Sequence, residues 1–278
     1  MKTGDWLIEA EKQLKAAGIE SARLDSRILL ERVTGEERFW LLAHAERTLS
    51  RNVLKKLHKD LQRRRLREPL AYVTGYKEFY GLSFKVTKAV LIPRPETEAM
   101  VQAAVESAPR NGRVLELGTG SGCVAIALKL ERADLEVTAT DISPAALEAA
   151  QINAKRHTAA INFIKSDLFS EVSGRYDLVL ANLPYVPSGT RRQPELDFEP
   201  ALALYGGTDG LDYYRRFLKE RKTYLVQPGG QVLIEAGPTQ RLELKRLAGA
   251  VGFDLSSISE YVSLLTYLGS KRRTGAGL

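Results

Sequence analysis

The chain has 278 residues, a length that suits one large domain or two smaller ones, and we expect two. Hydrophobic residues make up 44% of the sequence and charged residues 27%, as in ordinary globular proteins. No apolar run approaches the roughly 20 residues of a membrane-spanning helix, so we expect no membrane partner. The formal net charge of +7 suits attraction to acidic partners but does not identify a nucleic-acid binder, and direct nucleic-acid binding is not expected.

The first residues and the cysteine content bear on the compartment. Met1–Trp6 include Lys2 and Asp5 and lack the apolar core of a secretory signal, so we expect a cytoplasmic protein. Cys123 is the one cysteine of the sequence, and no disulfide can form within the chain. The three histidines are far apart and lack metal-ligand spacing, which predicts that there is no metal site.

Residues 1–69 are predicted to form a small helical domain. Apolar residues recur at helical intervals over Thr3–Arg67, and Gly18 and Gly35 suit helix ends. The densest basic stretch, Lys55–Arg67, is interleaved with leucines at helical spacing. This pattern is typical of a solvated helix face, with a docking surface for an acidic partner as the alternative.

Residues 70–95 are predicted to form a β-hairpin connector. From Tyr72 onward aromatic and β-branched residues are frequent, and Gly75 and Gly81 interrupt them, which favours a hairpin over a helix. Two prolines near the end of this segment impose an extended backbone before the next helix, because each disfavours helix in the residue before it. A helix is predicted from about Glu96.

Residues 96–278 alternate short apolar runs with helical stretches, which predicts an α/β domain with a mainly parallel, doubly wound sheet. The runs predicted to be its parallel strands are Val114–Leu117, Glu136–Thr140, Ile161–Ile164, Tyr176–Leu180 and Gln231–Glu235. Two final runs, Phe253–Ile258 and Ser263–Leu268, have no helix-length segment between them. They are therefore predicted to form an antiparallel hairpin at one end of the sheet.

The first motif with chemical content is Glu116-Leu117-Gly118-Thr119-Gly120-Ser121-Gly122, between a predicted strand and a predicted helix. Its glycines allow sharp turns and the close approach of a ligand to the backbone. Asp141 ends the next predicted strand, where its carboxylate suits ribose hydroxyl groups, and this indicates a nucleoside-containing cofactor. The spacing is Gly-x-Gly-x-Gly, not the Gly-x-Gly-x-x-Gly that suits a pyrophosphate, which favours S-adenosylmethionine over a nicotinamide dinucleotide.

Asp167 and Leu168 follow the third predicted strand. Ligands of open α/β sheets bind at the carboxyl ends of the strands, so the carboxylate can accept from an adenine amino group while the leucine covers the ring. The alternative is an aspartate that caps the next turn.

Asn182-Leu183-Pro184-Tyr185 follows the fourth predicted strand. A nitrogen beside a π-system is a poor nucleophile because its lone pair is delocalised, so a catalyst must hold both N–H groups and leave the lone pair facing the electrophile. The side-chain oxygen of Asn182 can accept one N–H and the backbone carbonyl of Leu183 the other. Pro184 restrains Leu183 to an extended conformation, and Tyr185 offers a flat face. The turn therefore predicts methylation of a planar nitrogen by positioning and electrostatics.

These residues resemble the release-factor glutamine methyltransferase family, whose members methylate the glutamine of the Gly-Gly-Gln motif in peptide chain release factors. The resemblance covers nearly the whole chain. Its specific parts, besides the glycine motif and the Asn182 turn, are Pro69–Gly75, Phe79–Gly81, Val90–Glu98, Asp167–Phe169, Glu199–Leu202, Gly206–Leu211, Glu235 and Gln240.

The resemblance implies a Rossmann-like methyltransferase fold dependent on S-adenosylmethionine, and an enzyme that methylates the glutamine side-chain amide and releases S-adenosylhomocysteine. Release factors are then the protein partners. The helical domain contains none of this chemistry, and we expect it to recognise the protein substrate. The predicted cofactor-binding residues are Gly118, Thr119, Gly120, Ser121, Gly122, Asp141, Asp167, Leu168 and Asn182. The predicted catalytic and substrate-binding residues are Asn182, Leu183, Pro184 and Tyr185.

One position departs from the family, which usually has proline where this chain has Leu183. The inferred role of the position is a backbone carbonyl, which leucine also supplies. Asn-Leu-Pro-Tyr is also the form found in enzymes that methylate adenine amino groups of ribosomal RNA, so an adenine-N6 methyltransferase acting on RNA or DNA is the alternative. A nicotinamide oxidoreductase is a third class, but it does not use the Asn182 turn.

Overall fold

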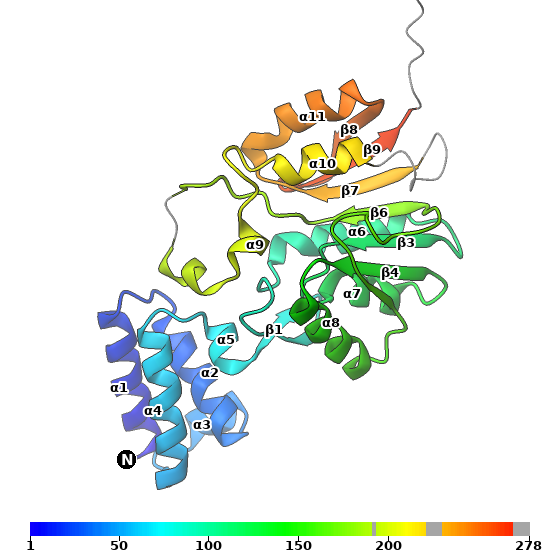
Figure 1. Cartoon of the computed structure of the whole chain (residues 1–278). Coiled ribbons are helices and arrows are strands. Elements are labelled where there is room, and N and C mark those ends of the chain that lie inside the picture. Colours follow the sequence, from blue (N-terminus) through cyan, green and yellow to red (C-terminus); the bar gives the residue numbers. More distant parts are fainter. Residues whose placement is uncertain (191–192, 221–229, 269–278) are drawn as a thin grey trace, which may run out of the picture. The chain divides into compact units, whose positions relative to one another are not determined.

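The structure, a computed structural model, describes residues 1–190, 193–220 and 230–268 (Figure 1). The chain divides into two compact units, one comprising Met1–Tyr76 with Arg192–Phe198 and the other Lys77–Arg191 with Glu199–Leu278. The last residues of the predicted 96–278 domain, 269–278, lie outside the described residues. In the described part of the chain, no helix has the length and apolar composition needed to cross a membrane.

The first unit is a bundle of helices. Its described helices are α1 (Thr3–Ala16), α2 (Ala22–Thr34), α3 (Arg38–Ala43), α4 (Arg51–Arg65), α5 (Leu70–Thr74) and the 3-10 helix η2 (Pro194–Phe198). Their apolar faces share a core that includes Trp6, Leu14, Leu29, Leu57 and Leu61. α2 ends where Gly35 adopts the left-handed conformation (φ 73°) and donates its N–H to the Glu31 carbonyl. The predicted helical bundle is confirmed.

A buried ion pair joins α2 to α4. Nε of Arg64 lies 2.7 Å from Oδ2 of Asp25, and the two side chains are only 7% and 4% exposed. The same guanidinium donates through Nη1 to the Glu68 carbonyl at 3.2 Å and to the Glu195 carboxylate at 3.3 Å. Removal of one partner from a buried pair leaves an uncompensated charge, so the bundle depends on Arg64 and Asp25 together.

The hairpin predicted for residues 70–95 begins later than expected, because Leu70–Thr74 form the short helix α5. Pro69 precedes its first turn, and Gly75 ends it in the left-handed conformation (φ 83°) while donating its N–H to the Ala71 carbonyl. Val73 packs into the helical core, and the helical turn is what directs it there. The aromatic composition of the segment alone did not indicate this turn. The hairpin itself consists of β1 (Tyr76–Phe79) and β2 (Leu82–Lys85).

The second unit is built on a seven-stranded sheet with the order β5-β4-β3-β6-β7-β9-β8. Its strands are β3 (Arg113–Leu117), β4 (Glu136–Asp141), β5 (Asn162–Lys165), β6 (Leu178–Ala181), β7 (Gln231–Glu235), β8 (Phe253–Ser257) and β9 (Val262–Tyr267). The first five are parallel, and β9 pairs antiparallel with both β7 and β8. The predicted doubly wound sheet with an antiparallel end hairpin is confirmed.

Helices cover both faces of this sheet. One buried cluster joins strand residues to α6 (Glu98–Ser107), α7 (Cys123–Glu131) and α8 (Pro144–Arg156). A second cluster joins the opposite face to α10 (Asp212–Glu220) and α11 (Arg241–Ala250), which Figure 1 shows beside β7 and β8. Short 3-10 and α-helical segments complete the unit: η1 (Pro95–Thr97), α9 (Ala201–Leu204) and η4 (Pro238–Gln240). Successive residues of β3 point into different clusters, Val114 into the first and Leu115 into the second, as expected of a strand buried on both faces.

The carboxyl end of β3 carries a buried acid. Glu116 is 4% exposed, and the Thr119 hydroxyl donates to its Oε2 at 2.6 Å. Burial raises the pKa of Glu116 from its ordinary value of 4.5 to about 8, because desolvation of the charged form outweighs the hydrogen bond from Thr119. The carboxyl group is therefore predominantly protonated at neutral pH in the folded protein.

Replacement of Arg64 by methionine is expected to destabilise the helical unit by about 3–5 kcal/mol, since Asp25 would keep a buried charge without its partner. Both tryptophans of the chain, Trp6 and Trp40, belong to this unit, so urea titration followed by tryptophan fluorescence reports its unfolding selectively. The control is Arg65→Met, at an exposed position of the same helix, which should shift stability by less than about 0.5 kcal/mol. Equal effects of the two substitutions would contradict the prediction.

The pKa of Glu116 makes stability depend on pH. Between pH 4.5 and about 8, Glu116 is ionised in the unfolded chain and protonated in the folded protein. The contribution of this group to the free energy of unfolding is therefore fully present below pH 4.5 and is lost as the pH rises through about 8. Glu116→Gln should therefore gain stability relative to the wild type across this range, as measured by urea melts monitored by circular dichroism. Glu136→Gln, at a position 66% exposed on β4, should show no such trend. A constant difference between Glu116→Gln and the wild type would refute the assignment.

Candidate functional site

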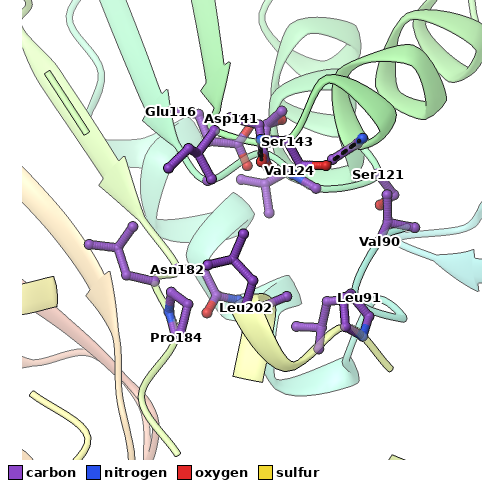
Figure 2. A pocket seen from close by; sticks show the side chains of 18 of the residues that line it. Val90, Leu91, Glu116, Ser121, Val124, Asp141, Ser143, Asn182, Pro184 and Leu202 are labelled. Carbon is purple, nitrogen blue, oxygen red and sulfur yellow. Dashed lines mark hydrogen bonds between the residues drawn. The ribbon is translucent and has the colours of Figure 1, made fainter. Parts of the chain in front are cut away.

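A cavity opens at the carboxyl ends of β3 and β6. These strands are neighbours in the sheet although β4 and β5 come between them in the chain, so the loops that follow them diverge and leave a crevice. Figure 2 shows Asp141 and Ser143 on one side of this cavity and Asn182, Pro184, Leu91 and Leu202 on the other. The predicted residues that line it are Gly118, Thr119, Gly120, Ser121, Asp141, Asp167, Leu168, Asn182, Leu183 and Pro184.

The glycine loop leads from β3 into α7, and its glycines differ in role. Gly120 (φ 54°) lines the cavity, and a Cβ there would meet nothing within 4 Å. Gly122 (φ 81°) is not among the lining residues, and a Cβ there would lie 3.0 Å from the Ala150 Cβ and 3.1 Å from the Ile126 Cδ1. Of the two, Gly120 leaves space for a ligand, whereas Gly122 is required by the packing of α7 against α8.

Asp141 connects the glycine loop to the start of α8. Its Oδ2 accepts the Gly120 N–H at 2.9 Å, and its Oδ1 accepts the Ser143 N–H at 2.9 Å. Burial raises the pKa of Asp141, and these two backbone hydrogen bonds oppose the shift. Each carboxylate oxygen retains a lone pair for a further donor on the cavity side.

Asp167 and Leu168 also line the cavity. Oδ2 of Asp167 lies 2.9 Å from the Arg216 guanidinium of α10, in an ion pair that is nearly half exposed on both sides. The turn that follows is held by the Ser166 and Ser170 hydroxyls, which accept the Glu171 and Asp167 N–H groups. The aspartate side chain therefore has an ion-pairing role in place of the capping role considered from the sequence.

The Asn182 turn forms the wall opposite the glycine loop. Asn182 donates through Nδ2 to the Thr97 hydroxyl at 3.3 Å. Leu183 is 4% exposed, and its N–H donates to the Tyr214 hydroxyl at 3.4 Å. Tyr185 is not among the cavity-lining residues of the described chain, because its hydroxyl donates instead to Oε1 of Glu235 at 3.3 Å. The structure thus brings the first three residues of the turn to the cavity and the fourth behind it.

A glycine-rich loop supports this turn from behind. A Cβ at Gly206 would lie 2.3 Å from the Pro184 carbonyl oxygen, and one at Gly210 would lie 2.1 Å from the Tyr185 carbonyl oxygen. Gln240 donates through Nε2 to the carbonyls of Tyr185 and Asp209, at 2.8 Å each. The resemblance included these three residues without giving them a role. The contacts of Gly206 and Gly210 show that only glycine allows the glycine-rich loop to lie so close to the backbone of Pro184 and Tyr185.

The resemblance also included Glu199 without giving it a role, and this acid fixes the cavity rim. The Glu199 side chain is 1% exposed, accepts the Ile92 N–H at 3.0 Å and pairs with the Arg94 guanidinium. This acid holds the segment that carries Leu91 to the segment that carries Leu202, and both leucines line the cavity (Figure 2). The sequence signal was an ordinary Glu-Pro pair, which does not reveal a partner 107 residues away.

The described residues contain no group of three or more His, Cys, Asp or Glu side chains that could hold a metal ion.

Two family models match the chain: the PrmC N-terminal domain over residues 5–75 and the Methyltransferase small domain over residues 96–194. Among solved structures, a methyltransferase from Pyrococcus furiosus aligns with a TM-score of 0.54 and 18% identity, covering 79% of this chain and 99% of that one. This likeness supports the methyltransferase fold.

Curated relatives are similar over most of their length. A release factor glutamine methyltransferase from Geobacter sulfurreducens is 38% identical over 91% of this chain and 89% of its own. One from Koribacter versatilis is 43% identical over 82% and 84%, and one from Escherichia coli strain K12 is 37% identical over 94% and 95%. At this identity and coverage, the chain belongs to the release factor glutamine methyltransferase family.

Proposed function

We propose that this protein transfers a methyl group from S-adenosylmethionine to the side-chain amide nitrogen of the glutamine in the Gly-Gly-Gln motif of a peptide chain release factor. The observation that carries the proposal is the orientation of Asn182 at the cavity wall. Its amino group is directed to Thr97, and its Oδ1 has no donor among the described residues. That oxygen suits an incoming amide N–H.

The cavity has the chemistry expected of a site for S-adenosylmethionine. Among the described residues, its lining includes the carboxyl groups of Asp141 and Asp167 and one basic group, Arg94, while the lining acid Glu116 is predominantly protonated at neutral pH. Such a lining is unfavourable for the pyrophosphate of a dinucleotide and favourable for a cationic ligand without phosphates. We propose that Asp141 holds the ribose hydroxyls, that Leu168 and Asp167 contact the adenine, and that residues 118–121 approach the ligand through their backbone. Gly122 then acts by packing.

The turn at Asn182 performs the catalytic positioning in this proposal. When bound, S-adenosylmethionine supplies an electrophilic methyl group on a sulfonium. Asn182 Oδ1 and the Leu183 carbonyl each accept one N–H of the glutamine amide, which orients the nitrogen without removing a proton beforehand. Pro184 keeps the Leu183 carbonyl in place because it restricts the residue before it. Tyr185, half-buried behind the turn, stabilises the position of the turn through the hydrogen bond from its hydroxyl to Glu235.

We further propose a division of labour along the chain. The helical domain, residues 1–69, recognises the release factor, residues 70–95 connect it to the rest, and residues 96–278 carry out methyl transfer. The cavity supports the separate role of the helical domain, since its described lining residues lie between Ala89 and Tyr213; the end of the connector, Ala89–Arg94, contributes to this lining.

The function is tested by incubation of the protein with labelled S-adenosylmethionine and either a purified release factor or ribosomal RNA. Mass spectrometry of proteolytic peptides should place the label on the glutamine of the Gly-Gly-Gln motif. Label on adenine in the RNA arm, with none on the release factor, would replace the proposal by adenine-N6 methylation.

Replacement of Gly120 by leucine should reduce the affinity for S-adenosylhomocysteine by at least about 10-fold, since the new side chain would enter open space that faces the cavity. The matched control is Gly81→Leu, because Gly81 also has a positive φ (69°) and open space but lies in the hairpin turn between β1 and β2. Both substitutions carry about 1–2 kcal/mol of left-handed strain. Calorimetry should show a loss of affinity in the first variant alone, and similar affinities would exclude Gly120 from the cofactor site.

Asn182→Ala should lower the turnover number for release-factor methylation by about 100-fold or more, because it removes one preorganised acceptor at the reacting group. Its affinity for S-adenosylhomocysteine should change less than its turnover. Asn162→Ala, at an exposed position of β5, serves as the control and should be fully active. A correctly folded Asn182→Ala protein with wild-type turnover would overturn the catalytic role of this residue.

A further inference from the structure

Glu235 is a buried acid behind the Asn182 turn. It ends β7, the strand next to β6, and is 1% exposed. Its Oε1 accepts the Tyr185 hydroxyl at 3.3 Å, whereas its Oε2 is buried and has no partner of normal hydrogen-bond geometry in the described residues. An incompletely satisfied buried acceptor is unfavourable, so its presence beneath this turn requires an explanation.

The groups around Glu235 are those of the proposed catalytic turn. Burial raises the pKa of Glu235, and the nearby polar side chains of Thr97, Tyr185 and Asn182 oppose that shift. The Asn182 amino group also donates to the Thr97 hydroxyl at 3.3 Å. Glu235 is therefore the common neighbour of two residues of the turn and of the threonine that contacts it.

At a pH above the pKa of Glu235 its carboxylate is ionised and can only accept hydrogen bonds, and this property fixes the direction of the surrounding contacts. A threonine hydroxyl has one hydrogen, and when that hydrogen faces Glu235 its lone pairs remain for the Asn182 amino group. The Asn182 carboxamide can then adopt only one of its two flipped orientations. In that orientation Nδ2 donates to the Thr97 hydroxyl, and Oδ1 is left for a donor from the cavity that Asn182 lines.

We propose that Glu235 is a positioning residue that sets the orientation of the Asn182 carboxamide, so that Oδ1 and not Nδ2 is presented to the substrate amide. The inference rests on the proposed function, in which Oδ1 accepts an N–H of the target glutamine. A flipped carboxamide would direct its own N–H groups at those of the glutamine, and the amide would no longer be held.

Glu235→Gln is the direct test. Glutamine keeps the size of the side chain but adds donors, so it removes the acceptor-only character that fixes Asn182. We expect the turnover number to fall about 10-fold or more while the affinity for S-adenosylhomocysteine stays within about 2-fold. In an Asn182→Ala background the same substitution should change turnover by less than about 3-fold, because its effect passes through Asn182. Equal losses in the two backgrounds would overturn the proposal.

A second set of variants guards against a folding defect in Glu235→Gln. Thr97→Ser keeps the intervening hydroxyl and should stay within about 3-fold of wild-type turnover, whereas Thr97→Val removes it and should fall about 10-fold or more. Ile234→Val, at the preceding position of β7, is the control for a mild loss of packing and should keep full turnover. Equal turnover in Thr97→Ser and Thr97→Val would contradict the positioning role.

A readout without methylation separates this inference from the proposed function. The side-chain amide of Asn182 can be observed by NMR with ¹⁵N-asparagine labelling and assigned by its absence in Asn182→Ala. Its two protons should exchange slowly with water in the wild type and at least about 10-fold faster in Glu235→Gln, because the hydrogen bonds that protect them are lost. Unchanged exchange in a protein that does methylate glutamine would refute the positioning role. Protected protons without glutamine methylation would refute the proposed function alone.

Discussion

The reversal of strand order at β3 and β6 is the constraint on which the site depends. Because both strands are parallel, their carboxyl ends lie at the same edge of the sheet, and because the chain winds outward from them in opposite directions, the following loops leave a crevice. The glycine loop and the Asn182 turn thereby face each other although they lie far apart in the sequence. A Cβ at Gly118 would be 3.5 Å from the Leu183 side chain, which shows how closely the two loops approach.

Buried acids then give this crevice its chemical character. Burial raises the pKa of Glu116, Asp141 and Glu235 alike, so desolvation acts in the same direction at acids of three strands, β3, β4 and β7. Their hydrogen-bond donors differ: Glu116 accepts from one hydroxyl, Asp141 accepts from two backbone N–H groups, and Glu235 accepts from the Tyr185 hydroxyl. The same desolvation therefore acts on three acids whose hydrogen-bond donors differ.

The sheet and the two cavity walls formed by the glycine loop and the Asn182 turn could be predicted because the signals are local. Apolar runs such as Gln231–Glu235 mark buried strands, and the glycine motif and the Asn182 turn each follow such a run directly. The contacts that support the site could not be predicted in the same way. Tyr185 and Glu235 are 50 residues apart, and Thr97 and Asn182 are 85 residues apart. Their proximity follows from strand order and loop packing, which no local pattern specifies.

Leu183 illustrates how a local departure is accommodated by the fold. Proline at this position would have a fixed φ and no N–H. Leucine instead donates its N–H to the Tyr214 hydroxyl at 3.4 Å and buries its side chain in the cluster that also contains Tyr214. The same hydroxyl donates to the Ala181 carbonyl at 3.3 Å, so Tyr214 contacts the backbone on both sides of Asn182. In this chain the position of the Leu183 carbonyl thus depends on the packing of the leucine side chain and on the hydrogen bond from the Leu183 N–H to the buried Tyr214 hydroxyl, in addition to the restraint from Pro184. The turn keeps its acceptor geometry through tertiary contacts where a proline would supply it through its own ring.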